Sequence, residues 1–112
     1  MSESKDINLT EEQLRAVREL LQQHIPEARV WAYGSRVKKT STAKSDLDMV
    51  AFGDVEPRLP ALREAFDESS LPFRVDLFSW NKIPEQFHSN IEENYFELQP
   101  ETDTHIRKPF SP

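Results

Sequence analysis

The sequence predicts a small two-layer α/β domain, in which a mixed β-sheet carries helices on one face. Apolar runs rich in β-branched and aromatic residues cover about 29–33, 46–52 and 73–78, and their lengths suit strands. Segments with apolar residues at helical spacing separate and flank these runs. A chain of 112 residues has the usual size of one domain. Strands that alternate with helices in this way are typical of an α/β fold.

Three helices are expected, and the first has the clearest start signal. Thr10 is its predicted N-cap, Gln13 completes a capping box, and Pro26 ends the helix. Its apolar stripe consists of Leu14, Val17, Leu21 and Ile25. A second helix is expected over about 59–69 and a third from about Pro84. The predicted stripe of the third helix is Phe87, Ile91 and Tyr95.

Side chains on the three predicted strands alternate between two faces of the sheet. The face expected beneath the helices carries Val30, Ala32, Leu47, Met49, Val75 and Leu77. The opposite face carries three acids, Asp46, Asp48 and Asp76. It also carries an apolar patch made of Trp31, Tyr33, Val50, Phe52 and Phe78. No local element is expected to cover this patch, and such patches usually mark interaction surfaces. We therefore expect a second protein, or a second copy of the chain, to dock there.

The stretch 33–52 joins the first two strands and holds the most informative motif. Gly34 is one of only two glycines, and its place between a strand and a polar turn lets the backbone approach something closely. Ser35 can bond an anion and cap a short helical turn that starts at Arg36, and the exposed amides of such a turn favour phosphate. Asp46 and Asp48 share one face of the following strand. Together with Asp76, these acids predict a site for a divalent metal and a nucleoside triphosphate.

This arrangement of Gly34-Ser35, ten residues, Asp46-x-Asp48 and a later lone Asp76 resembles the signature of the polymerase-beta-like nucleotidyltransferase superfamily. The resemblance covers about 10–96 and is to the minimal (MNT) members, which act as antitoxins beside HEPN-domain toxins. It implies Mg²⁺-dependent transfer of AMP from ATP to a tyrosine hydroxyl of a separately encoded helical HEPN partner.

The resemblance also implies roles for single residues. Asp46 and Asp48 would hold the nucleotide-bound Mg²⁺, and Asp76 would bind a second Mg²⁺ and help to deprotonate the acceptor hydroxyl. Gly34 and Ser35 would hold the phosphates. Arg36 or Lys44 would add positive charge to this site.

Two other interpretations remain open at this point. The fold could serve an interaction protein that neutralises its partner by binding alone. Alternatively, the enzyme could modify a small molecule, as in antibiotic-modifying relatives. The presence of all three acids favours an enzyme over an interaction protein, although acids at the start of a strand are also common on plain solvated surfaces.

Composition excludes several other classes of function. The net charge of −6 disfavours general nucleic-acid binding, since such domains are usually basic. The local exception is the basic loop of Arg36, Lys38, Lys39 and Lys44. Cysteine is absent, which excludes disulfides and thiolate chemistry. With no apolar signal region or bilayer-spanning run, a cytoplasmic protein is expected. We expect flexible ends at 1–9 and 99–112 around a catalytic domain at 10–98.

Overall fold

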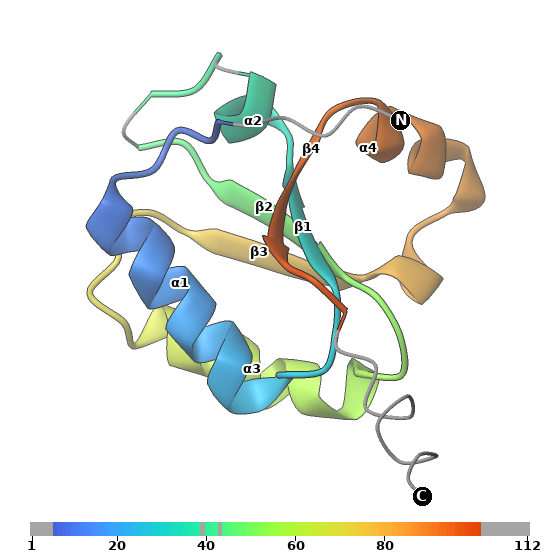
Figure 1. Cartoon of the computed structure of the whole chain (residues 1–112), viewed down its shortest axis with the longest axis horizontal. Helices are drawn as coiled ribbons and strands as arrows, with labels where there is room; N and C mark the ends of the chain where they lie inside the picture. The colour runs from blue at the N-terminus through green and yellow to red at the C-terminus, as the bar shows by residue number, and fades with distance from the viewer. Residues whose placement is uncertain (1–5, 39, 43, 102–112) are drawn as a thin grey trace, which may run out of the picture.

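The computed structural model describes residues 6–38, 40–42 and 44–101 of the chain (Figure 1). Its strands are β1 (Val30–Tyr33), β2 (Leu47–Ala51), β3 (Val75–Ser79) and β4 (Tyr95–Gln99). Its α-helices are α1 (Glu11–His24), α2 (Ser35–Lys38), α3 (Leu59–Asp67) and α4 (His88–Glu93). Short 3-10 turns precede α3 and α4: η1 (Glu56–Arg58), η2 (Trp80–Lys82) and η3 (Glu85–Phe87).

The strands form one mixed sheet in the order β3-β2-β1-β4, which confirms the predicted fold class. β1 runs antiparallel to both β2 and β4, whereas β2 and β3 are parallel. The register places Tyr33 opposite Asp48, and Asp48 opposite Asp76. These three side chains therefore form one row across the sheet, because residues in register point to the same face.

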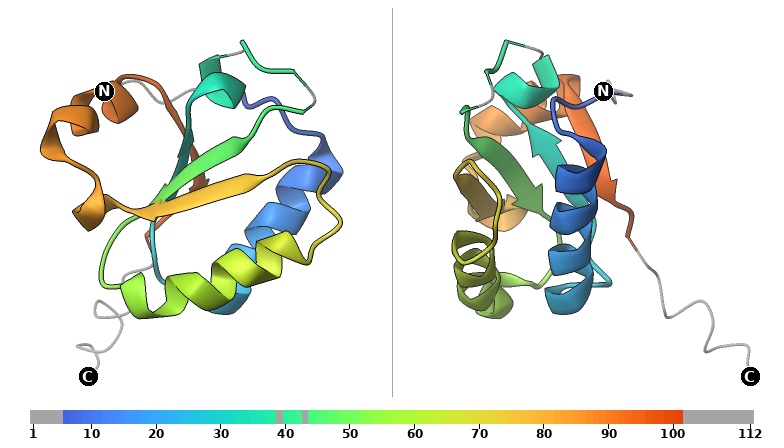
Figure 2. Two further views of the ribbon diagram at one scale, coloured as in Figure 1. Left: turned by 180° about the vertical axis from the view of Figure 1, so that it is seen from behind. Right: turned by 90° about the vertical axis from the view of Figure 1, so that its left-hand side faces the viewer.

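The two long helices, α1 and α3, lie side by side against one face of the sheet (Figure 2). The capping box at Thr10 and Gln13 is present, as predicted. Val17 and Leu21 of α1 and Leu62 of α3 are completely buried. The strand residues that meet these helices are Val30, Ala32, Leu47, Met49 and Leu77, which confirms the predicted inner face.

The opposite face corrects one expectation, because the chain itself covers much of the apolar patch. The segment after β3 folds back so that Ile91 of α4 packs against Trp31 and Val50. Figure 2 shows the strands lying between this segment and the pair of long helices. Trp31 is 4% exposed and Val50 is fully buried, so neither lies on an open docking surface. Of the predicted patch, Phe78 remains exposed.

The third predicted helix is shorter than its periodicity suggests. Phe87 belongs to η3 and Ile91 to α4, but Tyr95 begins a strand that the sequence did not predict. Tyr95 stacks on Trp31 with the ring centroids 3.8 Å apart. Its apolar contact is therefore real, but it is made from β4 and not from a continuous helix.

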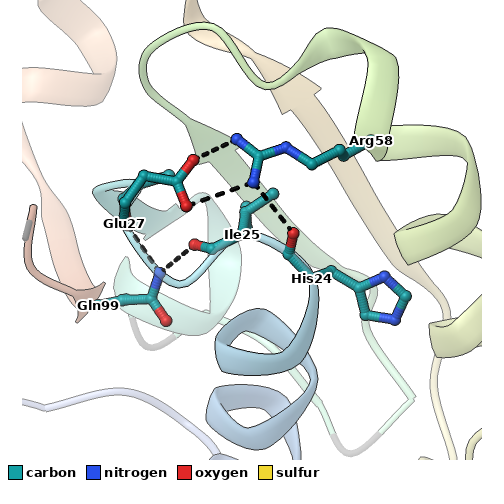
Figure 3. A network of polar contacts seen from close by, with 6 residues as sticks. His24, Ile25, Glu27, Arg58 and Gln99 are labelled. Carbon is teal, nitrogen blue, oxygen red and sulfur yellow. Dashed lines mark hydrogen bonds and ion pairs between the residues drawn. The ribbon is translucent and has the colours of Figure 1, made fainter.

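Polar contacts fasten the loop after α1 to distant elements (Figure 3). Arg58 of η1 forms an ion pair with Glu27 and reaches the carbonyl oxygen of His24. The Gln99 amide donates to the carbonyl oxygens of Ile25 and Ala28, each at 2.7 Å. The hydrogen bond from Arg58 lowers the pKa of the Glu27 carboxyl.

Ordered structure extends beyond the predicted domain limits of 10 and 98. The backbone N–H of Asn8 donates to the carbonyl oxygen of Arg36 at 2.9 Å, and Gln99 belongs to β4. The other parts of the predicted flexible ends, 1–5 and 102–112, lie outside the described residues. Within the described part of the chain, no helix combines the length and apolar character needed to cross a membrane.

Candidate active site

Two acidic side chains lie next to each other on the face opposite the long helices. Asp48 of β2 and Asp76 of β3 are register partners in the parallel strand pair, and both are partly exposed. Tyr33 of β1 continues the row on the other side of Asp48. Asp48 and Asp76 thus lie side by side on neighbouring strands, but the predicted convergence of all three acids, Asp46 included, is not seen among the described residues.

Gly34 brings the backbone of the motif turn directly against this row. Its φ of +88° lies in the region that glycine adopts far more readily than other residues. A Cβ atom placed on Gly34 would lie 2.6 Å from Oδ2 of Asp48, which is too close for any real side chain. The close approach expected of Gly34 is therefore an approach to the Asp48 carboxylate.

The carboxylates in this row repel each other, and this repulsion favours the binding of a cation. Burial, followed by the negative charges of Asp76 and Asp46, raises the pKa of Asp48 from its ordinary 3.8 to about 6. Burial, followed by Asp48 and Asp76, raises the pKa of Tyr33 to about 12. A bound cation would relieve this repulsion, because it favours the ionised carboxylates.

The carboxylates are suitable ligands for a divalent cation, but in the structure the three side chains do not surround one point. Carboxylate oxygens are the ligands that Mg²⁺ prefers. Asp46 directly precedes β2 and is exposed, and Oδ1 of Asp76 lies 3.2 Å from Nε of Arg74. In residues 6–38, 40–42 and 44–101, no three acids or histidines already form a metal-binding group. Arg74 is largely exposed, so its ion pair with Asp76 is weak and easily displaced.

The motif turn differs from the prediction that Ser35 caps a helix starting at Arg36. The helix begins at Ser35, and Gly34 takes the capping position because its carbonyl oxygen accepts from the N–H groups of Val37 and Lys38. Ser35 is half-buried beside Gly34 at the start of α2. It thus stays next to the acidic row, where a phosphate ligand is expected.

Arg36 is buried and points into the protein. Its guanidinium donates to the carbonyl oxygens of Ser45 and Asn8 and lies 4.1 Å from the ring centroid of Phe73. The expected contact of Arg36 with phosphate is therefore contradicted. Arg36 instead connects three segments, since Ser45 precedes the Asp46-x-Asp48 motif and Phe73 precedes the strand that carries Asp76.

A pocket of about 460 Å³ lies beside the acidic row and was not foreseen from the sequence. Tyr33, Gly34, Lys38 and Phe78 line it together with residues from the 82–94 segment. Lys38 and Lys82 are its cationic lining residues. Lys38 belongs to the basic loop that the sequence shows, but nothing in the local sequence connects it with Lys82.

Two further lysines, Lys39 and Lys44, belong to the basic loop. Lys44 is exposed and is not among the residues that line the pocket. Its contact with a nucleotide stays a prediction. Lys39 lies outside the described residues.

Comparison of the chain with known proteins agrees with the motif in the sequence and with the geometry of the site. A family model described as the nucleotidyltransferase domain matches residues 11–99. The chain belongs to this nucleotidyltransferase family. The probable protein adenylyltransferase MntA of Haemophilus influenzae is 38% identical over 113 residues, covering 97% of each chain. The predicted family and enzyme class are therefore confirmed.

Solved structures share the fold of this nucleotidyltransferase at lower sequence identity. A toxin–antitoxin crystal structure with AMP-PNP has a TM-score of 0.65 and 19% identity, covering 78% of this chain and 73% of that chain. The crystal structure of the toxin–antitoxin MntA-HepT has a TM-score of 0.50 and 17% identity, covering 88% of this chain and 77% of that chain. At these identities the comparison establishes a common fold.

Proposed function

We propose that this nucleotidyltransferase is a protein adenylyltransferase that transfers AMP from ATP to a tyrosine hydroxyl of a helical toxin of the HEPN (HepT) type. The observation that carries the proposal is the register pairing of Asp48 with Asp76 beside Gly34. The name of the Haemophilus influenzae relative supports the activity, and the MntA-HepT structure supports the kind of partner.

The reaction forms one bond and breaks one. The tyrosine oxygen attacks the α-phosphorus of ATP, and the bond from this phosphorus to the oxygen bridging to the β-phosphate breaks. Pyrophosphate leaves with the electron pair of that bond, and the proton of the hydroxyl passes to a base. Such a reaction depends mainly on in-line positioning and on neutralisation of phosphate charge.

Each residue of the site has a task in this scheme. Asp46, Asp48 and Asp76 would hold Mg²⁺, which supplies positive charge to the phosphates when bound. Asp76, at the outer end of the row, receives the proton of the acceptor hydroxyl. The backbone at Gly34 and the hydroxyl of Ser35 hold the terminal phosphates.

The proposal is tested with ATP radiolabelled at the α-phosphate, Mg²⁺ and the purified helical partner. The wild-type chain is expected to label the partner. Asp48→Asn and Asp76→Asn should each reduce the rate by about 10²-fold or more, since each removes a charge that acts in the transition state. Asp67→Asn is the matched control, because Asp67 is an exposed acid at the end of α3, away from the site.

Three outcomes separate the alternatives. Label on a tyrosine of the partner supports the proposal. Neutralisation of the toxin without any label, unchanged by Asp48→Asn, would establish an interaction protein that acts by binding alone. Label on a small molecule of a cell extract, with none on the partner, would establish a different acceptor.

A further inference from the structure

We propose that the pocket beside Gly34 is the nucleobase subsite and that Asn90 and Asn94 select adenine within it. This inference rests on the proposed function, because it assigns the base specificity of the same reaction. The position of the pocket is the first argument. Tyr33 and Gly34 form part of its wall, so a nucleotide whose phosphates lie at the motif turn can place its base there.

The size and walls of the pocket suit a nucleoside. Its volume of about 460 Å³ falls in the range of small-molecule sites. Phe78 of β3 and Phe87 of η3 line it, and they are the large apolar side chains most exposed in the described part of the chain, at 44% and 47%. Phe78 is two residues after Asp76 on the same strand face. Exposed aromatic rings next to a phosphate site offer surfaces on which a base can stack.

Two side-chain amides provide polar groups that can read the base. Asn90 lies on α4, and Asn94 follows at the C-terminal end of that helix. Both line the pocket, and neither side-chain amide forms a hydrogen bond with any described residue. An asparagine amide matches the edge of adenine, donating to a ring nitrogen and accepting from the exocyclic amine. The N7 and O6 atoms of guanine are both acceptors and are better met by arginine or lysine.

The charge of the pocket favours a nucleotide over an aromatic side chain of the acceptor protein. Lys38 and Lys82 line the pocket, and no acid among the described residues does, although the chain carries 20 acids and a net charge of −6. Two cations beside an apolar cavity complement the phosphates and ribose oxygens of ATP. A neutral tyrosine ring would use the apolar walls but neither the lysines nor the amides.

The test measures binding of MgATP, MgGTP and MgCTP to the full chain by titration calorimetry, with magnesium tripolyphosphate as the probe of the phosphate site. Wild type should bind ATP at least tenfold more tightly than GTP or CTP. Asn90→Ala and Asn94→Ala should each reduce this preference severalfold and leave the affinity for tripolyphosphate unchanged. Asn81→Ala is the matched control, because Asn81 is an exposed asparagine of η2 that does not line the pocket.

Phe87→Leu provides a second variant that does not depend on the amides. Phe87 is exposed, so its replacement should preserve folding while it weakens ATP binding severalfold. Equal affinities of wild type for the three nucleotides, or an unchanged preference in both asparagine variants, would overturn the inference.

The outcome of this test is separable from that of the proposed function. A nucleotide preference that maps to Asn90 and Asn94, without AMP transfer to a partner, would leave the subsite standing and refute the adenylyltransferase. Transfer that is lost in Phe87→Leu while ATP binding is unchanged would instead assign the pocket to the acceptor. A wild-type chain that binds no MgATP would contradict both proposals.

Discussion

A methyl group on Gly34 would lie 2.6 Å from Oδ2 of Asp48, so the phosphate turn and the acidic row cannot be altered independently. Gly34→Ala must displace the Asp48 carboxylate and also strain the backbone at a φ of +88°. We expect a loss of about 1 kcal/mol in unfolding free energy. AMP transfer should fall much further, by about 10²-fold, because the carboxylate is moved.

Gly53 provides the control for this substitution. Its φ of +97° imposes the same kind of backbone strain, but a Cβ atom placed there would meet nothing within 4 Å. Gly53→Ala should therefore lose similar stability and keep its transfer rate. Urea denaturation and the radiolabel assay measure the two effects, and equal transfer rates for both variants would contradict the role given to Gly34.

The raised pKa of Asp48 predicts a pH dependence of stability in the absence of divalent metal. The folded-state pKa of about 6 lies above the ordinary 3.8, so the folded chain binds more protons between these values. Stability due to this group is present below about pH 4 and is lost as the pH rises through 6. Asp48→Asn should exceed wild type by about 1 kcal/mol at pH 7.5, after allowance for solvent screening of a half-exposed carboxyl.

Thermal melts with a chelator at pH 4 and pH 7.5 check this prediction. The advantage of Asp48→Asn should largely vanish at pH 4, and Asp67→Asn should show no advantage at either pH. With Mg²⁺ and ATP the order should reverse, since ligand binding stabilises the wild type by mass action. A variant less stable than wild type at pH 7.5 without metal would show that Asp48 is not strained.

The buried position of Arg36 predicts a stability phenotype. Its substitution by methionine leaves the carbonyl oxygens of Ser45 and Asn8 without their donor. We expect a loss of about 2–3 kcal/mol in unfolding free energy, measured by urea denaturation. Lys44→Met, at an exposed position of the same loop, should change it by less than about 0.5 kcal/mol. A fully stable Arg36→Met with weak ATP binding would restore the phosphate role.

The covered aromatic patch predicts opposite results for two positions on one sheet face. Trp31 is 4% exposed and stacks on Tyr95, so Trp31→Glu buries a charge and should unfold the chain. Phe78 is 44% exposed, so Phe78→Glu should leave a folded protein. Circular dichroism distinguishes the two, and a folded Trp31→Glu would show that the segment after β3 does not cover this face.

The sequence was most informative where local signals suffice. The alternation of strand residues placed Asp48 and Asp76 on one face, and the Thr10 capping box located the start of α1. Prediction from the sequence failed where contacts between residues far apart in the chain determine the local structure. Ile91 and Tyr95 follow helical spacing, but pairing with β1 draws Tyr95 into a strand. Whether Arg36 faces a phosphate or the interior depends on Asn8 and Ser45, which local sequence rules do not connect to it.

Titration of Mg²⁺ in the presence of ATP, followed by the side-chain carboxyl carbon resonances of aspartate in NMR, tests the central claim most directly. The account predicts that the resonances of Asp48 and Asp76 shift together along one binding curve, while that of Asp67 stays unchanged. Asp46 should follow the same curve, because the cation draws this exposed carboxylate towards the pair. Resonances of Asp48 and Asp76 that stay fixed, or that follow separate curves, would contradict a shared cation site.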